Sequence, residues 1–218
     1  MENTKKTERE FNRIKKDMFR TLEQLNVPIS ELEKDFENYL VPANNTRALR
    51  DFIWSQFNKH IGRMSHDFQF QAFTYSAMAN FRHKYEGDRD TFELKKLSFQ
   101  AMKMNDEHLI HSKIGRYNAH IIAFPDCCPA CAVDKDRYID LKEFLQMDIL
   151  PHKDCTCIDY GCNCTYACTP KKSEDGTYVL NLEVLNSSDS KKVVKPSQLQ
   201  QEGAKSILNI FNFFLKKK

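Results

Sequence analysis

The cysteines of this chain are confined to one short stretch. All eight lie between Cys127 and Cys168, and the rest of the 218-residue sequence contains none. The first residues are charged and lack the apolar core of a secretory signal peptide, so we expect a cytoplasmic protein whose thiols stay reduced. Clustered thiols in a reducing compartment are more often metal ligands than disulfides. The sequence therefore predicts a metal-binding module in this stretch.

The spacing of the cysteines indicates how a metal would be held. Residues 128–131 form a C-x-x-C knuckle, in which two thiolates can converge on one tetrahedral ion. Further along, His152, Cys155 and Cys157 offer an imidazole and two thiolates, and two of these three would complete a four-coordinate site. Thiolates together with imidazole favour Zn²⁺ as the cofactor. The predicted metal ligands are Cys128, Cys131, His152, Cys155, Cys157, Cys162, Cys164 and Cys168.

The ligand count leaves the number of ions open. Eight cysteines and His152 make nine candidates, which could fill two four-coordinate sites with one left over, such as Cys127. One ion is the simplest expectation, and two ions or none are the alternatives. A typical catalytic zinc ion has only three protein ligands, and this stretch offers many more candidates than three. The surplus of candidate ligands favours a closed, structural site. One or two of the cysteines could instead be ordinary buried apolar residues.

The same residues are compatible with two other chemistries. A C-x-x-C pair can be a redox dithiol, but that motif belongs at the start of a helix after a strand in an α/β fold. Most of this chain has a helical pattern instead, and a dithiol would leave six cysteines unexplained. A disulfide framework would require export from the cytosol.

The part of the chain before the cysteines has the periodicity of helices. Apolar residues from Phe11 to Leu25 recur at intervals of three and four, and similar stripes follow to about residue 114. Ser30 with Glu33 has the spacing of a capping box, and Gly87 stands where a helix C-cap is expected. A third helix is expected to begin near Asn45, and Ser65 is expected to cap a fourth. Short helices are marginal alone in water, so we expect them to pack as a bundle.

The pattern changes in the second half of the chain. Residues 117–124 and 178–185 alternate as strands do, and the cysteines lie between them. Residues 186–192 read as a polar linker, and Ser197 is expected to cap an amphipathic last helix that ends in three lysines. We predict an α+β protein with a helical bundle (1–116), a small zinc-stabilised, β-containing module (117–185), and a linker with a C-terminal helix (186–218).

The cysteine region also follows an ordered pattern: C-x-x-C, an acidic turn, an aromatic residue, then Pro-His and C-x-C. This order resembles the C-terminal motif of phage head-morphogenesis proteins of the Mu F type. The resemblance departs from the family at Lys135, Lys153 and Thr156, and does not extend to the last three cysteines. It would imply a minor component of a phage procapsid, associated with the portal. The matching positions are Cys128, Cys131, Asp134, Tyr138, His152, Cys155 and Cys157.

The composition narrows the classes of function. The chain has 33 basic and 30 acidic residues, and a formal net charge of +3 is too small to indicate nucleic-acid binding by itself. No apolar run is long enough for a transmembrane helix. We find no Gly-rich phosphate loop and no serine elbow.

These observations favour a non-enzymatic, zinc-finger-like structural or assembly protein that is cytoplasmic and binds a protein partner through its C-terminal helix. A zinc-dependent nucleic-acid-binding protein is the first alternative, because Lys171, Lys172, Lys191, Lys192 and Lys195 could supply a basic face. A metalloenzyme or thiol oxidoreductase is the second, and would require an open coordination position or an activated thiol.

Overall fold

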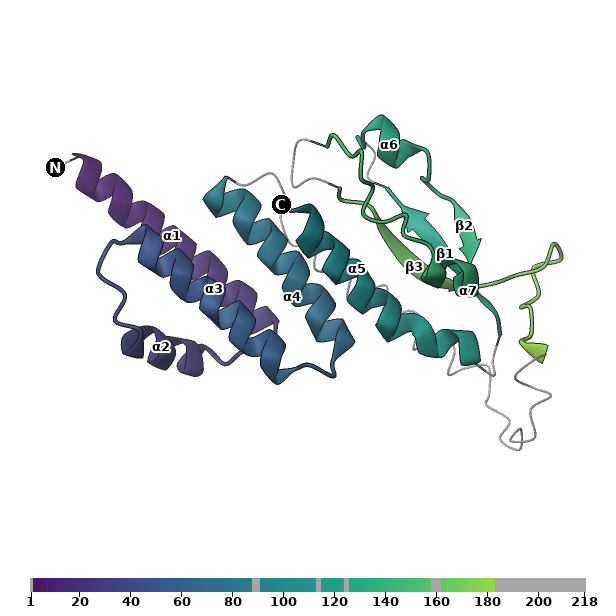
Figure 1. Cartoon of the computed structure of the whole chain (residues 1–218), viewed down its shortest axis with the longest axis horizontal. Helices are drawn as coiled ribbons and strands as arrows, with labels where there is room; N and C mark the ends of the chain where they lie inside the picture. The colour runs from purple at the N-terminus through teal and green to yellow at the C-terminus, as the bar shows by residue number, and fades with distance from the viewer. Residues whose placement is uncertain (1, 88–90, 113–114, 124–125, 158–161, 183–218) are drawn as a thin grey trace. The chain divides into compact units, whose positions relative to one another are not determined.

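The computed structural model describes residues 2–87, 91–112, 115–123, 126–157 and 162–182. They form two compact units, one reaching Met102 and the other containing the described residues from Lys103 onward. Helices dominate, and a small antiparallel sheet accompanies them (Figure 1). The predicted α+β class is therefore confirmed.

The first unit is a bundle of helices around an aromatic and aliphatic core. Helix α1 packs against α2 and α3, and α3 packs against α4. The rings of Phe36 and Phe52 meet edge to face with their centroids 5.3 Å apart. Ile14, Leu22 and Phe57 are fully buried beside them. Its elements are α1 (Glu2–Gln24), α2 (Ile29–Asn38), α3 (Thr46–Arg63), α4 (Phe68–Phe81), the π-helical η1 (Arg82–Glu86) and the first part of α5 (Phe92–Asp106).

Two predicted helix ends are confirmed. The third helix was expected to begin near Asn45, and its Oδ1 accepts a hydrogen bond of 3.0 Å from the backbone N–H of Ala48, at the start of α3. Gly87 follows η1 with a φ of 68°, the left-handed conformation of a C-cap glycine.

Two predicted caps are wrong. Helix α2 begins at Ile29 after Pro28, with no side-chain cap, so Ser30 lies inside the first turn and makes no capping box with Glu33. Pro28 is itself the N-cap residue, in an extended conformation with φ −61° and ψ 132°, and the helix begins two residues before a cap at Ser30 would start it. The fourth helix is capped by Asp67, which accepts a hydrogen bond of 2.8 Å from the N–H of Phe70, and not by Ser65.

The second unit is built on a three-stranded antiparallel sheet in the order β2-β1-β3. The central strand pairs Ala119 with Ile139 on one side and with Cys168 on the other. Helix α7 packs against β1, β2 and η2. The elements are η2 (Glu107–His111), β1 (Tyr117–Ile122), α6 (Pro129–Ala132), β2 (Tyr138–Asp140), α7 (Leu141–Gln146) and β3 (Thr165–Pro170), shown in Figure 1.

The core of this unit is small. Phe144 of α7 and Tyr166 of β3 are fully buried, and their ring centroids lie 4.5 Å apart. The hydroxyl of Tyr166 donates a hydrogen bond of 2.9 Å to Oδ2 of Asp106, which gives the buried phenol a partner. Ile121 and Leu141 complete the apolar centre.

The predicted strands are only partly observed. Strand β1 lies where the strand 117–124 was predicted, although Phe124 is outside the described residues. The strand predicted at 178–185 is wrong for its described part, in which Tyr178 forms only an isolated bridge with Lys172. The linker and C-terminal helix predicted for 186–218 lie outside the described residues. Within the described chain, we find no helix with the length and apolar character needed to cross a membrane.

Candidate metal centre

Seven of the predicted ligands converge in the second unit. They form two groups of four, and within each group the ligand atoms all lie within 4.8 Å of one another. Cys131 is a member of both groups. The first group consists of Cys128, Cys131, Cys155 and Cys157, and the second group consists of Cys131, His152, Cys162 and Cys164.

The C-x-x-C knuckle is a single turn of helix. Cys128 is the N-cap residue of α6, and Pro129 occupies the first helical position, where the missing N–H of proline is not needed. The N–H of Cys131 donates to the carbonyl of Cys128 at 3.0 Å and closes the turn. This local geometry places the two thiols on the same side of α6, as the sequence spacing predicts.

Distances within the first group match those around a tetrahedral ion. Sγ of Cys155 lies 3.8 Å from Sγ of Cys128 and 3.6 Å from Sγ of Cys131. Zn–S bonds of about 2.3 Å at the tetrahedral angle place two sulfurs about 3.8 Å apart. Backbone amides also point at these sulfurs, because the N–H of Cys128 donates to Cys157 at 3.3 Å and that of Thr156 donates to Cys128 at 3.4 Å.

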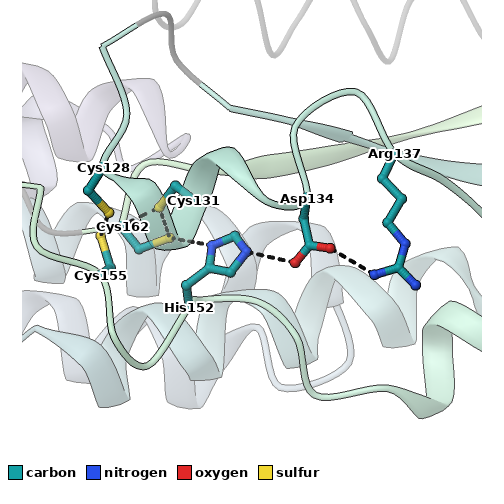
Figure 2. Close-up of polar contacts among 7 residues, drawn as sticks. All are labelled: Cys128, Cys131, Asp134, Arg137, His152, Cys155 and Cys162. Carbon is teal, nitrogen blue, oxygen red and sulfur yellow. Dashed lines mark hydrogen bonds and ion pairs between the residues drawn. The ribbon is translucent and has the colours of Figure 1, made fainter.

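The second group has a comparable geometry with a nitrogen ligand. Sγ of Cys162 lies 3.7 Å from Sγ of Cys131 and 3.5 Å from Nδ1 of His152 (Figure 2). For a tetrahedral zinc ion, a Zn–N bond of about 2.0 Å beside a Zn–S bond gives an N–S separation of about 3.5 Å. Cys131, Cys162 and Cys164 are buried, so this group is largely shielded from water.

A chain of polar contacts supports the imidazole from behind. Nε2 of His152 lies 3.1 Å from Oδ2 of Asp134, and Nη1 of Arg137 donates to Oδ1 of Asp134 at 2.8 Å. Figure 2 shows His152 between the sulfurs and the carboxylate. Burial alone would raise the pKa of Asp134, but Arg137 and His152 outweigh it and lower that pKa. A carboxylate in this position fixes the ring orientation of metal-binding histidines.

The thiols share their protons unevenly when no cation is present. The hydrogen bond from Cys164 is the main cause that lowers the pKa of Cys162 to about 4, and His152 adds to it. The same contact, together with burial, raises the pKa of Cys164. Burial likewise raises the pKa of Cys155 to about 12. The pKa values of Cys162 and Cys128 are therefore lowered while those of their neighbours Cys164 and Cys155 are raised, and a bound cation would displace the remaining protons.

The other two cysteines lie outside both groups. Cys168, a predicted ligand, is on β3, and its thiol donates to Oδ2 of Asp106 at 3.4 Å. Burial is the main cause that raises the pKa of this thiol. Cys127 precedes the knuckle and belongs to neither group.

The support of His152 by Asp134 and Arg137 was not predicted from the sequence. Asp134 was named only as a position of the family resemblance, without this role. Its spacing of three from Arg137 is common to many surface ion pairs and is too weak a signal to predict the support. The two groups could hold a metal ion, and sulfur with imidazole is a donor set that suits soft or borderline divalent cations. Comparison of the chain with protein-family models, with curated proteins and with solved structures gives no match.

Proposed function

We propose that the second unit is a structural zinc module and that the chain is a non-enzymatic assembly or interaction protein whose module is kept folded by the metal. The observation that carries this proposal is that each group brings four ligand atoms within 4.8 Å of one another. Two separations in each group, between 3.5 and 3.8 Å, match those around a tetrahedral ion. Catalytic zinc sites normally keep one position open for water or substrate, whereas structural sites have four protein ligands.

The long connection between α7 and β3 supports a structural role for a metal. In its described part, residues 147–157 and 162–164, it contains no helix or strand. Connections of more than about 12–15 residues without secondary structure are uncommon in compact domains. This one carries His152 and four of the cysteines in the two groups, so a metal would tie it to the knuckle at α6. Zinc binding would thereby contribute directly to folding.

An enzymatic reading of the same contacts has a specific basis. Cys162, His152 and Asp134 are arranged in the order of a nucleophile, a base and an orienting acid. Cys162 is only 6% exposed, however, and its sulfur contacts another thiol, Cys131. A nucleophile must be reached by its substrate, so this geometry favours a metal ligand.

The partner class also belongs to the proposal. The resemblance to Mu F-type head-morphogenesis proteins would make the partner a phage capsid or portal protein, and the metal module would then stabilise one surface of an assembly. A basic, nucleic-acid-binding face is less favoured because acidic residues, including Asp136 and Asp140, lie in the same unit.

Metal removal in the full chain tests the proposal. The metal content of purified protein would be measured, and amide NMR spectra would be compared before and after a strong chelator. We expect signals of residues 103–182 to lose their dispersion, helical signals of the first unit to persist, and Zn²⁺ to restore the spectrum. An unchanged spectrum and melting temperature after complete metal removal would reject a structural metal.

Alkylation distinguishes the enzymatic reading. Iodoacetamide would be added to the zinc-loaded protein, and modified cysteines would be identified by mass spectrometry. Ligands of a structural ion are expected to be protected until chelator is added. Rapid, selective modification of Cys162 with zinc present would favour a nucleophilic thiol instead.

A further inference from the structure

We propose that the module holds two metal ions that share the thiolate of Cys131, as a binuclear zinc cluster. This inference rests on the proposed function and specifies its site. Two four-coordinate ions need eight ligand positions, and the two groups contain seven different residues. One bridging ligand makes up the difference, and Cys131 is the residue common to both groups.

The position of Cys131 suits a bridge. Its Sγ lies 3.6 Å from Sγ of Cys155 in the first group and 3.7 Å from Sγ of Cys162 in the second. Each distance is close to the edge of about 3.8 Å expected for a tetrahedron of sulfurs around zinc. Cys131 is fully buried, so two lone pairs of its thiolate can be directed at the two ion positions and not at water.

A single ion would use only part of this arrangement. An ion in the first group would leave His152, Cys162 and Cys164 unused, although the imidazole and Cys162 already stand at ligand spacing. An ion in the second group would leave Cys128, Cys155 and Cys157 unused. Backbone amides already donate to these sulfurs, including the N–H of Cys157 to Cys155 at 3.4 Å. Each group therefore has the ligands for one ion of a two-ion site.

Charge balance gives a second reason for two ions. The groups contain six cysteines and one histidine. With all six thiols ionised, one Zn²⁺ would leave a formal charge of about −4, whereas two leave about −2, the same as one zinc on four thiolates. Burying uncompensated charge is costly, and Arg137 already pairs with Asp134. The second cation therefore stabilises the full thiolate set.

The test uses the full chain loaded with ¹¹³Cd²⁺, which binds thiolate sites like zinc and is observed by NMR. Metal analysis is expected to give two ions per chain, with two ¹¹³Cd resonances of equal intensity. Because the ions share a sulfur, each resonance should be split by coupling to the other. Two unsplit resonances would mean separate sites and would overturn the bridge.

Variants identify each ion. Cys157→Ser removes a ligand of the first group only and Cys164→Ser one of the second only, so each should reduce the content from two ions to one and abolish the splitting. Cys127→Ser is the matched control because it changes a neighbouring cysteine outside both groups, and it should keep two coupled ions.

The outcomes separate this inference from the proposed function. One ion per wild-type chain, in a module that unfolds when the ion is removed, would overturn the cluster and leave the structural site standing. A folded module that binds no metal would reject both. Two coupled resonances in the wild-type chain support the cluster even if a serine variant fails to fold.

Discussion

Nε2 of His152 lies 3.1 Å from Oδ2 of Asp134, so the opposite ring nitrogen, Nδ1, is the one that lies 3.5 Å from Sγ of Cys162. A neutral imidazole has one N–H and one lone pair. The carboxylate favours the tautomer with its proton on Nε2, which leaves the lone pair of Nδ1 directed toward the sulfurs. The orientation of this candidate ligand thus depends on Asp134.

Asp134→Asn should weaken metal binding without removing a ligand. The amide is nearly isosteric but accepts a weaker hydrogen bond and carries no charge, so the imidazole becomes less basic and less well oriented. Loss of such a support typically lowers metal affinity by about 10–100-fold. The affinity would be measured by competition with a chromophoric chelator, and the number of ions bound at saturation should not change.

Asp136→Asn is the matched control for this variant. Asp136 is in the same loop, its side chain is 70% exposed, and its φ of 60° is one that asparagine tolerates. We expect the control to bind metal as the wild type does. Equal affinities for Asp134→Asn and the wild type would show that the carboxylate does not support the ligand.

Tyr85→Phe should raise the pKa of Asp17 in the helical unit. Burial alone would raise that pKa, but the Tyr85 hydroxyl, at 2.5 Å, and the Lys84 ammonium, at 2.9 Å, outweigh it and hold it below its ordinary value. The carboxylate therefore stabilises the fold above the unfolded pKa of about 3.9, and this contribution is lost as the pH falls through the folded pKa.

The ¹³C shift of the Asp17 carboxyl, followed against pH in the full chain, measures this effect. In Tyr85→Phe the midpoint should move up toward the ordinary aspartate value. Tyr39→Phe removes a half-exposed hydroxyl elsewhere in the same unit and should leave the midpoint in place. A midpoint that is identical in Tyr85→Phe and the wild type would contradict the assignment.

Phe144→Ala should destabilise the small module severely. Phe144 is fully buried against Tyr166, and truncating such a ring typically costs about 3–5 kcal/mol. Urea unfolding at fixed free Zn²⁺, followed by NMR signals of the module, measures the loss. Val133→Ala, at a position 81% exposed, should change the free energy of unfolding by less than about 0.5 kcal/mol. Similar effects of the two variants would contradict the proposed core.

The helical part of the fold could be predicted from the sequence because its apolar stripes are long. The stripe from Phe11 to Leu25 contains residues that are buried in the structure, including Ile14 and Leu22. Helix ends were harder to predict. A capping box at Ser30 was expected to begin the second helix, but Pro28 is the N-cap residue of α2. Proline is compatible with the N-terminus of a helix, so the helix can begin there without a side-chain cap.

Strands β2 and β3 could not be predicted from the sequence. Strand β2 spans only Tyr138–Asp140, too short for alternation to be recognised. In β3 only Tyr166 is buried, while its other residues are partly or fully exposed, so no period of two appears. These strands are defined by pairing with β1, which is a non-local property of the fold.

All seven candidate ligands were predicted from their spacing along the chain. Their division into two groups that share Cys131 was not predicted. Spacing along the chain relates Cys128 to Cys131, because one helical turn joins them. Whether Cys131 also meets Cys162 depends on how the connection after α7 returns to α6. Cys168 lies instead in a strand, opposite Ala119. Contacts made when a long loop folds back cannot be deduced from the spacing of residues along the chain.

The residue after the C-cap of α2 offers a test of backbone strain in the bundle. Leu40 has a left-handed φ of 52° and is 81% exposed, so its side chain gains little from burial. The left-handed conformation costs an ordinary residue about 1 kcal/mol, and Leu40→Gly should therefore raise the free energy of unfolding by up to that amount. Gly87→Ala should lower it by about 1 kcal/mol, because its φ is also left-handed at 68°. A Cβ at Gly87 would meet no atom within 4 Å, so the loss would come from the backbone alone. Urea unfolding of the helical signal measures both variants, and a loss of stability in Leu40→Gly equal to that in Gly87→Ala would contradict the strain at Leu40.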